Sequence, residues 1–520
     1  MTTADLPDAR TSTLALPAPR RTPAPDVGGT HEALLAAAAV VGTSRVVSAV
    51  DEQGRAVPIA RSGNVSMFRS RSVLGTVRPR TPQQARAVVL AFDRFPDACG
   101  LQALSTGRNW GLGSREPAFD DVVTLDLGDL TEIRELDLAR GYAVIDPGVT
   151  QGQLAARLTG TDRMVNVTNS ASCTSIVGNA VERGVGFRAQ RVDDLLGLEV
   201  VLPDGDLVRV GWWPEAERAT PAYPHGLGPG LLPLFLQSDL GIVTGAVVRL
   251  LPRPERQRVV RVSFPGDRLV PAVDAIRGWL VAGLVDAVPK LYDDAATNRY
   301  GGSADAGEFV AHLCVDGTAR TIDVLVDLLV AEARATGAFT DVDCAEEPAD
   351  LVARDVVANY AGDPTHNDAV FGATFGTPPE GLDDSGQGWL FFLPLVPFTG
   401  ADVAAANRLK EQLAVETGVR FGSVLHGLST EYADFVMSVR FGPEDRDAVH
   451  AALDRAHELF VGAGFLPYRL DVDHADWTDR VAPDAAARNL TLRLKRLLDP
   501  HDTIAPSRYG HPRPEGWNGR

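Results

Sequence analysis

The stretch "LQALSTGRNWGLGSREP" at residues 101–117 decides how the rest of the sequence is interpreted. Its apolar start is typical of a strand, and it continues into a loop with glycines at Gly107, Gly111 and Gly113 among small polar side chains. The strand-like "VVTLDL" follows at 122–127. A glycine-rich loop after a strand lets backbone N–H groups approach an anion such as a phosphate or pyrophosphate. The same pattern also suits an ordinary surface turn, so the loop by itself leaves both interpretations open.

The bulk properties indicate a globular protein of two domains. The chain has 520 residues and a formal net charge of -18, which argues against a general nucleic-acid binder. The widely spaced residues Cys99, Cys173, Cys314 and Cys344 indicate neither a disulfide framework nor a metal site, and they fit a reducing cytoplasm. We find no apolar run long enough to span a membrane. Residues 1–29, rich in proline, threonine and alanine, are expected to form a disordered tail.

Strands and helices are predicted to mix without regular alternation, which favours an α+β fold over a doubly wound sheet. Thr81 and Pro82 are a typical N-cap and first residue for a helix over 80–92. Two apolar runs around Asp204-Gly205 predict a hairpin over 197–211. A second strand pair is expected over 240–252, and amphipathic helices over 269–284, 319–336 and 445–464.

Two common phosphate-binding motifs are excluded. The chain contains no Gly-Lys pair, so it has no Walker A loop. The segment "GVGFRA" at 184–189 fits the spacing of a dinucleotide fingerprint, but it follows the helix-like "NAVER" and not a strand.

Further segments carry a resemblance to a known family. "STGRNWGLGSREP", "YAVIDPGVTQGQL", "SIVGNAVERGVGF", "GLEVVLPDGDLVRVG" and "QSDLGIVTGAVVRLLPRPE" occur in the order seen in the vanillyl-alcohol oxidase / p-cresol methylhydroxylase family of FAD enzymes. "LKRLLDPHDTIAPSRYG" at the C-terminal end resembles the closing helix and signature of that family. The resemblance implies a PCMH-type FAD-binding domain at 30–255, an inserted α+β cap domain for the substrate at 256–487, and a return to the FAD domain at 488–520.

The resemblance also implies where FAD binds. The loop from Ser105 to Gly113 would hold the pyrophosphate, Ser172 to Asn179 would run beside the flavin, and Ile242 and Val243 would contact the adenine half. The cofactor-binding residues implied in this way are Ser105, Thr106, Gly107, Arg108, Asn109, Trp110, Gly113, Pro147, Gly148, Ser172, Cys173, Ile176, Gly178, Asn179, Ile242, Val243 and Arg508.

Many relatives tether their flavin covalently, but this chain departs from their patterns. Asn109 or Trp110 stands where some relatives with a related fold have a histidine, and the cap strand "STEYADFVMSVRF" contains no histidine. We therefore expect dissociable FAD. Tyr432, Cys173 and His426 remain the candidate attachment points.

The catalytic residues are also implied by the resemblance. Tyr468 and Arg469 in "PYRLD" match the tyrosine–arginine pair that holds a phenolate in the 4-hydroxybenzyl branch. Leu112 stands in place of a third phenolate ligand, and Ser170 stands where that branch has an acidic residue. The candidate replacement bases in the cap are His426, Glu431 and Asp434, and Tyr432 is expected near the substrate-binding site.

The sequence thus predicts an FAD-dependent oxidase or dehydrogenase that transfers a hydride from a small alcohol, amine or phenolic compound to the flavin. Such a substrate would suit secondary metabolism. The electron acceptor is either oxygen or a carrier protein, and a cytoplasmic homodimer is expected. An oxidative cyclase of the same fold, or a relative that binds FAD without turnover, would carry the same sequence features.

Overall fold

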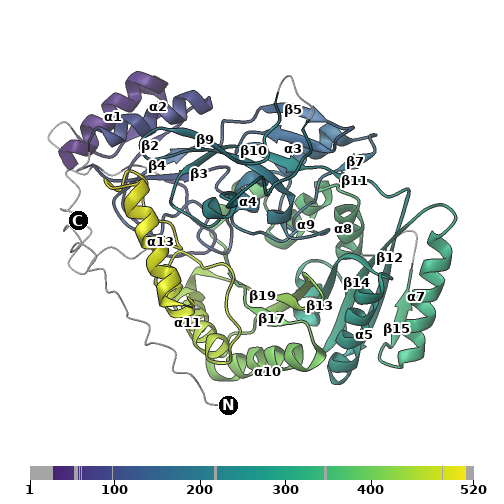
Figure 1. Ribbon diagram of the computed structural model, residues 1–520. Coiled ribbons are helices and arrows are strands. Elements are labelled where there is room, and N and C mark those ends of the chain that lie inside the picture. The colour runs from purple at the N-terminus through teal and green to yellow at the C-terminus, as the bar shows by residue number, and fades with distance from the viewer. Residues whose placement is uncertain are drawn as a thin grey trace, which may run out of the picture.

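A computed structural model describes residues 27–51, 57, 59, 61–95, 98–215, 220–344, 348, 350–482 and 484–510. Two bodies built around separate β-sheets lie one above the other, with helices on their outer sides (Figure 1). The predicted disordered tail lies outside the described residues except for its last positions, 27–29, which begin helix α1 (Val27–Val41).

The first sheet carries the glycine-rich loop. Its strands are β1 (Val46–Ser48), β2 (Val73–Val77), β4 (Val122–Asp126) and β3 (Leu101–Leu104), in that order, and β2, β4 and β3 run parallel. Helix α2 (Pro82–Asp93) begins as predicted, because the Thr81 side chain accepts a hydrogen bond from the N–H of Gln84. Helices α1 and α2 pack against each other and share one apolar core with this sheet.

The second sheet has the order β5 (Ile133–Asp137), β6 (Tyr142–Ile145), β10 (Ile242–Arg249), β8 (Leu195–Val201) and β9 (Leu207–Gly211). The hairpin predicted around Gly205 is confirmed, and Gly205 has the left-handed φ of 83° that its turn requires. The strand pair expected over 240–252 is wrong. The segment forms the long strand β10, because Gly245 marks an irregularity in its pairing with β8 and not a turn. The short strand β11 (Leu251–Pro252) follows, but it pairs with β7 (Arg163–Met164) and not with β10.

A third sheet dominates the second half of the chain. Its strand order is β15-β12-β14-β13-β18-β19-β16, and β17 also pairs with β19. Helices α5 (Leu269–Ala282), α7 (Ile322–Thr336), α10 (Gly400–Thr417) and α11 (Arg446–Gly462) cover its outer side (Figure 1). The strands are β12 (Arg256–Pro265), β13 (Asp286–Asp293), β14 (Glu308–Gly317), β15 (Asp341–Asp343), β16 (Gly388–Phe392), β17 (Leu395–Pro397), β18 (Gly422–Gly427) and β19 (Tyr432–Phe441).

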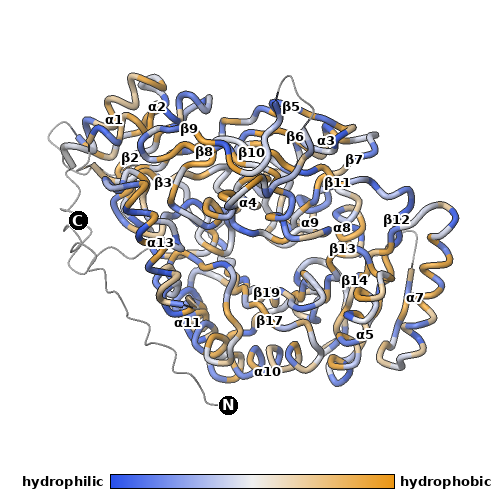
Figure 2. The backbone as a smooth tube through the Cα atoms, viewed as in Figure 1, coloured by the Kyte–Doolittle hydropathy of each residue, from blue (hydrophilic) through white to orange (hydrophobic). Residues whose placement is uncertain are grey.

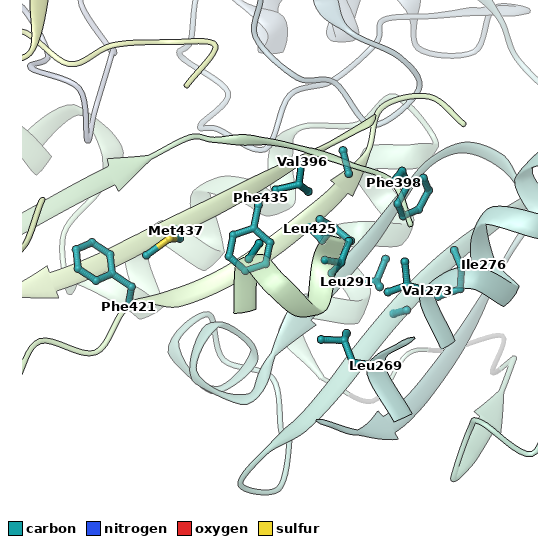
Figure 3. Packing of buried hydrophobic residues seen from close by; sticks show 14 of the residues in the cluster. Leu269, Val273, Ile276, Leu291, Val396, Phe398, Phe421, Leu425, Phe435 and Met437 are labelled. Atoms are coloured by element: carbon teal, nitrogen blue, oxygen red, sulfur yellow. The ribbon is translucent and has the colours of Figure 1, made fainter. Parts of the chain in front are cut away.

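The two faces of this third sheet differ in chemistry. Leu291, Leu425 and Phe435 occupy paired positions on β13, β18 and β19 and pack into the largest apolar core, against residues of α5 (Figure 3). Figure 2 shows hydrophilic and hydrophobic residues alternating along the covering helices, as expected of helices with one buried side. Since side chains alternate along a strand, the preceding residue on each of these strands faces the other way.

Helices between and beside the sheets complete the fold. The chain end returns to the first sheet, where Leu101 and Ile504 form a parallel bridge after α13. The mixed α+β class is confirmed, and no helix among the described residues is both long and apolar enough to cross a membrane. The remaining elements are α3 (Gln151–Leu158), β7 (Arg163–Met164), α4 (Ile176–Val181), β11 (Leu251–Pro252), α6 (Asp294–Arg299), α8 (Leu351–Tyr360), α9 (Thr365–Phe375), α12 (Thr478–Val481) and α13 (Ala485–Leu498).

The buried face of the third sheet gives the first prediction. Replacement of Leu291, whose side chain lies in the core, by alanine should lower the free energy of unfolding by about 2–5 kcal/mol through lost apolar burial and the cavity left behind. Urea denaturation measures this change. The matched substitution Val415→Ala, at a side chain that is 87% exposed on α10, should change it by less than about 0.5 kcal/mol. Equal effects would contradict the assigned core.

Candidate functional site

Two cavities meet between the sheets. The first, here called the loop cavity, lies between the glycine-rich loop, helix α4, the start of β10 and the returning C-terminal segment 504–508. The second, the cap cavity, lies over the inner face of the third sheet. Five residues line both cavities and therefore mark their junction: Arg108, Asn109, Thr174, Asn179 and Arg469.

The glycine-rich loop has the backbone that its sequence suggests. Gly107, Gly111 and Gly113 all have left-handed φ values, of 68°, 78° and 119°. At Gly178, which also lines the loop cavity, a Cβ atom would lie 2.4 Å from the Oγ atom of Ser105. The cavity wall therefore requires glycine where the loop and α4 approach each other.

A buried carboxylate from the other half of the chain fixes this loop. Asp383 accepts hydrogen bonds from the indole N–H of Trp110 at 3.2 Å, from the hydroxyl of Ser114, and from the backbone N–H of Val65 at 3.1 Å. Burial raises the pKa of Asp383, and these donors oppose the rise. The conformation of the loop thus depends on a contact that no local sequence pattern predicts.

The structure places most of the implied cofactor residues around the loop cavity. Gly148 instead packs against the backbone of Gly128, and burial raises the pKa of the Cys173 thiol to about 11 among aromatic side chains. Gly113, Gly148, Ser172, Cys173 and Ile176 line neither cavity, and Trp110 lines only the cap cavity. The residues that do line the loop cavity are Ser105, Thr106, Gly107, Arg108, Asn109, Pro147, Gly178, Asn179, Ile242, Val243 and Arg508.

Arg508 ties the C-terminal segment to this cavity. Its guanidinium donates to the Oε2 atom of Glu182 at 2.6 Å, and the hydroxyl of Tyr509 donates to the same oxygen at 2.9 Å. Burial alone would raise the pKa of Glu182, but Arg508 and Arg469 hold it below its usual value. Glu182 is therefore a paired carboxylate in the wall of the loop cavity.

The floor of the cap cavity carries a row of ionisable residues. Lys290, His426 and Asp434 occupy paired positions on the neighbouring strands β13, β18 and β19. His426 and Asp434 line the cavity, as does Asp355 of α8. Burial raises the pKa values of Asp355 and Asp434 to about 7 and lowers that of Lys290 to about 7. The aromatic wall of the cavity is formed by Tyr292, Tyr300, Phe371, Trp389 and Phe391.

Tyr468 and Asp434 form a hydrogen-bonded pair at this floor. The Tyr468 hydroxyl donates to the Oδ2 atom of Asp434 at 3.2 Å, and the Nδ1 atom of His426 lies 3.6 Å from the same oxygen. Burial, with Lys290 nearby, lowers the pKa of His426 well below its usual value, so this imidazole is neutral at neutral pH. Asp434 is then the group in this trio whose charge changes near neutral pH.

Arg469 connects the two cavities. Its Nη2 atom donates to the Oδ1 atom of Asn109 in the glycine-rich loop at 2.7 Å. The Nε atom of Arg469 and the Oδ1 atom of Asn179 are buried and have no hydrogen-bond partner within the described part of the chain. Polar atoms of this kind are expected where a ligand supplies the missing partner.

Ser170, Tyr432 and Glu431, which the sequence also places at the site, do not lie at the junction of the two cavities. Ser170 lines the cap cavity, but its hydroxyl shares a hydrogen bond with that of Thr174 at 2.7 Å. Tyr432 lines neither cavity, and its hydroxyl lies 3.5 Å from the Oε1 atom of Gln190. Glu431 is exposed and lines neither cavity.

Sequence reasoning missed Lys290 and Asp355, which are both buried. A charged residue inside an apolar strand pattern was the only available signal for Lys290. It lies in "AVPKLYD", and its ammonium group sits 4.3 Å from the ring centroid of Phe187. The sequence also suggests that His450 and His457 are surface residues. That interpretation is wrong for His457, which is 1% exposed.

Comparisons with known proteins agree with this geometry. Residues 73–211 match the FAD binding domain family. The chain is 28% identical to a 1'-carboxy-chondrochloren decarboxylase of Chondromyces crocatus, over 84% of this chain and 96% of that protein. It is 26% identical to the flavoprotein subunit of 4-cresol dehydrogenase [hydroxylating] of Pseudomonas putida, over 79% and 83% of the two chains.

Solved structures share the fold across nearly the whole chain. Substrate-bound p-cresol methylhydroxylase has a TM-score of 0.77 at 22% identity and covers 93% of this chain and 97% of its own. The 4-ethylphenol oxidase of Gulosibacter chungangensis in complex with isoeugenol has a TM-score of 0.80 at 19% identity, with the same coverage. The glycine-lined loop cavity and the unpartnered polar atoms at its junction with the cap cavity fit FAD.

The glycine-rich loop gives the second prediction. Gly107→Val should abolish FAD binding, because a left-handed φ disfavours a branched side chain and a Cβ atom would lie 2.5 Å from the side chain of Arg115. The flavin absorbance of the purified protein measures the loss. Gly160→Val imposes the same backbone strain, with φ of 76°, at a residue that lines neither cavity, and should retain FAD. A fully loaded Gly107→Val protein would contradict the site.

Proposed function

We propose that the chain is an FAD-linked oxidoreductase of the vanillyl-alcohol oxidase / p-cresol methylhydroxylase family and that it removes a hydride from a small phenolic substrate bound in the cap cavity. The observation that carries this proposal is the position of Arg469, which lines both cavities and donates to Asn109 of the glycine-rich loop. A substrate and a flavin that meet at this junction would share one fixed positive charge.

When bound, FAD supplies the acceptor for the hydride. The chain supplies charge and orientation. Loss of a hydride leaves an electron-poor carbon, and an oxyanion elsewhere on a conjugated substrate compensates for it. Arg469 carries a guanidinium positive charge and can stabilise that oxyanion.

The proton of the substrate hydroxyl needs an acceptor. Asp434 is the supported candidate, because its carboxyl is fully buried, titrates near neutral pH and already accepts the Tyr468 hydroxyl proton in a hydrogen bond. Once ionised, it can take a proton that the Tyr468 hydroxyl relays from the substrate. His426 is then a neutral neighbour of Asp434 and not the base.

A second reaction is favoured by one relative. The Chondromyces crocatus protein, which this chain matches over 96% of its length, is named as a decarboxylase. A planar guanidinium such as that of Arg469 binds carboxylates as well as phenolates. Release of carbon dioxide together with flavin reduction would assign the chain to oxidative decarboxylation.

The FAD is proposed to be dissociable. This is supported by the positions of Tyr432 and Cys173 outside the lining of both cavities, and by the burial of His426 between Lys290 and Asp434. Acid precipitation tests it, because a dissociable flavin stays in the supernatant. Oxygen consumption distinguishes oxygen from a carrier protein as the electron acceptor, and the mass of the protein in solution tests the expected homodimer.

Arg469 gives the third prediction. Arg469→Ala should lower the rate of flavin reduction by 4-ethylphenol about 10²–10³-fold, the usual cost of removing one oxyanion-stabilising group. Rapid mixing under anaerobic conditions, followed by the flavin absorbance, measures this rate. Arg480→Ala, at a mostly exposed guanidinium, is the control and should react normally. An unchanged rate in Arg469→Ala would remove Arg469 from the mechanism.

The titration of Asp434 gives the fourth prediction. Because burial raises its pKa to about 7, the basic form appears only as pH rises through about 7, and the flavin-reduction rate should increase over that range. The pH profile of the rate measures this. In Asp434→Asn the rate should be low and should not rise over that range, whereas a retained rise would assign the titration to another group.

A further inference from the structure

The segment that carries Tyr468 and Arg469 continues directly into a buried ionic cluster. Asp471 lies two residues after Arg469, and its Oδ1 atom accepts the backbone N–H groups of Asp473 at 2.8 Å and His474 at 3.0 Å. The Nδ1 atom of His474 lies 2.9 Å from both carboxylate oxygens. The Nε2 atom of His457, from helix α11, lies 3.5 Å from the Oδ2 atom.

The arrangement of the two rings argues against a metal site. The imidazoles of His457 and His474 are stacked, with centroids 3.8 Å apart and an angle of 10° between their planes. Imidazole lone pairs lie in the ring plane, so two parallel rings cannot both direct a nitrogen at one ion. Both nitrogens of His474 are also engaged, since its Nε2 atom lies 3.1 Å from the Oδ1 atom of Asp454.

The cluster is held together by charge. Burial alone would raise the pKa of Asp471, but His474 and the hydrogen bonds from both histidines hold it far below its usual value. Burial alone would lower the pKa of His474, but Asp471 raises it above its usual value, with Asp454 and Asp473 contributing. A buried carboxylate therefore faces an imidazole whose protonated form it favours, and removal of the imidazole leaves that carboxylate buried without its partner.

The neighbouring contacts leave this segment little freedom. The Tyr468 carbonyl accepts a hydrogen bond from Gln237 at 2.8 Å, and the Val472 carbonyl accepts one from Arg71 at 2.8 Å. Leu470, between Arg469 and Asp471, is 3% exposed. The backbone is thus fixed immediately before Arg469 and again at Asp471 and Val472.

We propose that Asp471, His474 and His457 are positioning residues that hold Arg469 against Asn109 at the junction of the two cavities. The three residues act as a clamp on the segment 468–474 and do not line either cavity. This inference rests on the proposed function, because it assigns the clamp to the same Arg469 that would stabilise the oxyanion and the reduced flavin. Loosening the clamp should therefore act on the flavin through Arg469.

A double-mutant cycle on the FAD-loaded enzyme tests this inference. The reduction potential of the bound flavin, measured by equilibration with reference dyes, reports the positive charge beside the flavin. Arg469→Ala should lower this potential, and Asp471→Asn should lower it in the same direction. In the Arg469→Ala background, Asp471→Asn should cause no further change. The midpoint temperature of unfolding should fall after Asp471→Asn in both backgrounds, because that effect is structural.

The outcomes separate the clamp from the proposed function. If Arg469→Ala lowers the potential but neither Asp471→Asn nor His474→Gln does so, the proposed clamp on Arg469 is overturned and the role of Arg469 itself stands. Equal shifts by Asp471→Asn with and without Arg469 would also overturn it. If Arg469→Ala changes neither the potential nor the flavin-reduction rate, both proposals fail. Asp454→Asn, at a side chain that is 69% exposed, should shift the potential least.

Discussion

The hydrogen bond from Arg469 to Asn109 is the contact on which the candidate site depends. It joins a segment that follows the third sheet to the loop between β3 and β4 of the first sheet, at residues 360 positions apart in the chain. Both residues line both cavities, so the bond sets how the two binding spaces face each other. A charged donor and an amide acceptor make a stronger hydrogen bond than a neutral pair, which suits a contact that must fix geometry.

Asp383 imposes a second constraint on the same loop. By accepting hydrogen bonds from Trp110, Ser114 and Val65, it removes alternatives that the three left-handed glycines would otherwise leave open. Glycine permits the loop conformation at a cost in conformational entropy, and a buried carboxylate with several donors offsets that cost. The loop is therefore shaped locally by its glycines and fixed globally by the second half of the chain.

Much of the fold was predictable because the signals are local. Thr81 and Pro82 specify the start of α2, and Asp204-Gly205 specifies the hairpin of β8 and β9. That residues 242–249 form one continuous strand, β10, was not predictable in this way, because β10 pairs with β6 and β8, which lie far from it in the sequence.

The residues of the candidate site show the same difference between local and long-range signals. The glycine-rich loop and the Tyr468-Arg469 pair are short contiguous signals, and the resemblance to the family gave them a role. Asp355 and His457 lie on helices whose buried faces are settled only by packing, so neither their burial nor their partners could be read from spacing. Lys290 is buried in a strand beside His426, where only sheet register brings the row together.

The row on the inner face of the third sheet explains why this sheet can serve a chemical role as well as a structural one. Leu291, Leu425 and Phe435 face the core, while the residues next to them on the same strands, Lys290, His426 and Asp434, face the other way. Burial shifts the pKa of each of these three groups in the direction that favours the uncharged form, and it places the pKa values of Lys290 and Asp434 at about 7. Groups with such pKa values exchange protons readily at neutral pH, whereas lysine and aspartate side chains in water would be fully charged. Strand alternation thus gives one sheet both an apolar core and a titratable floor.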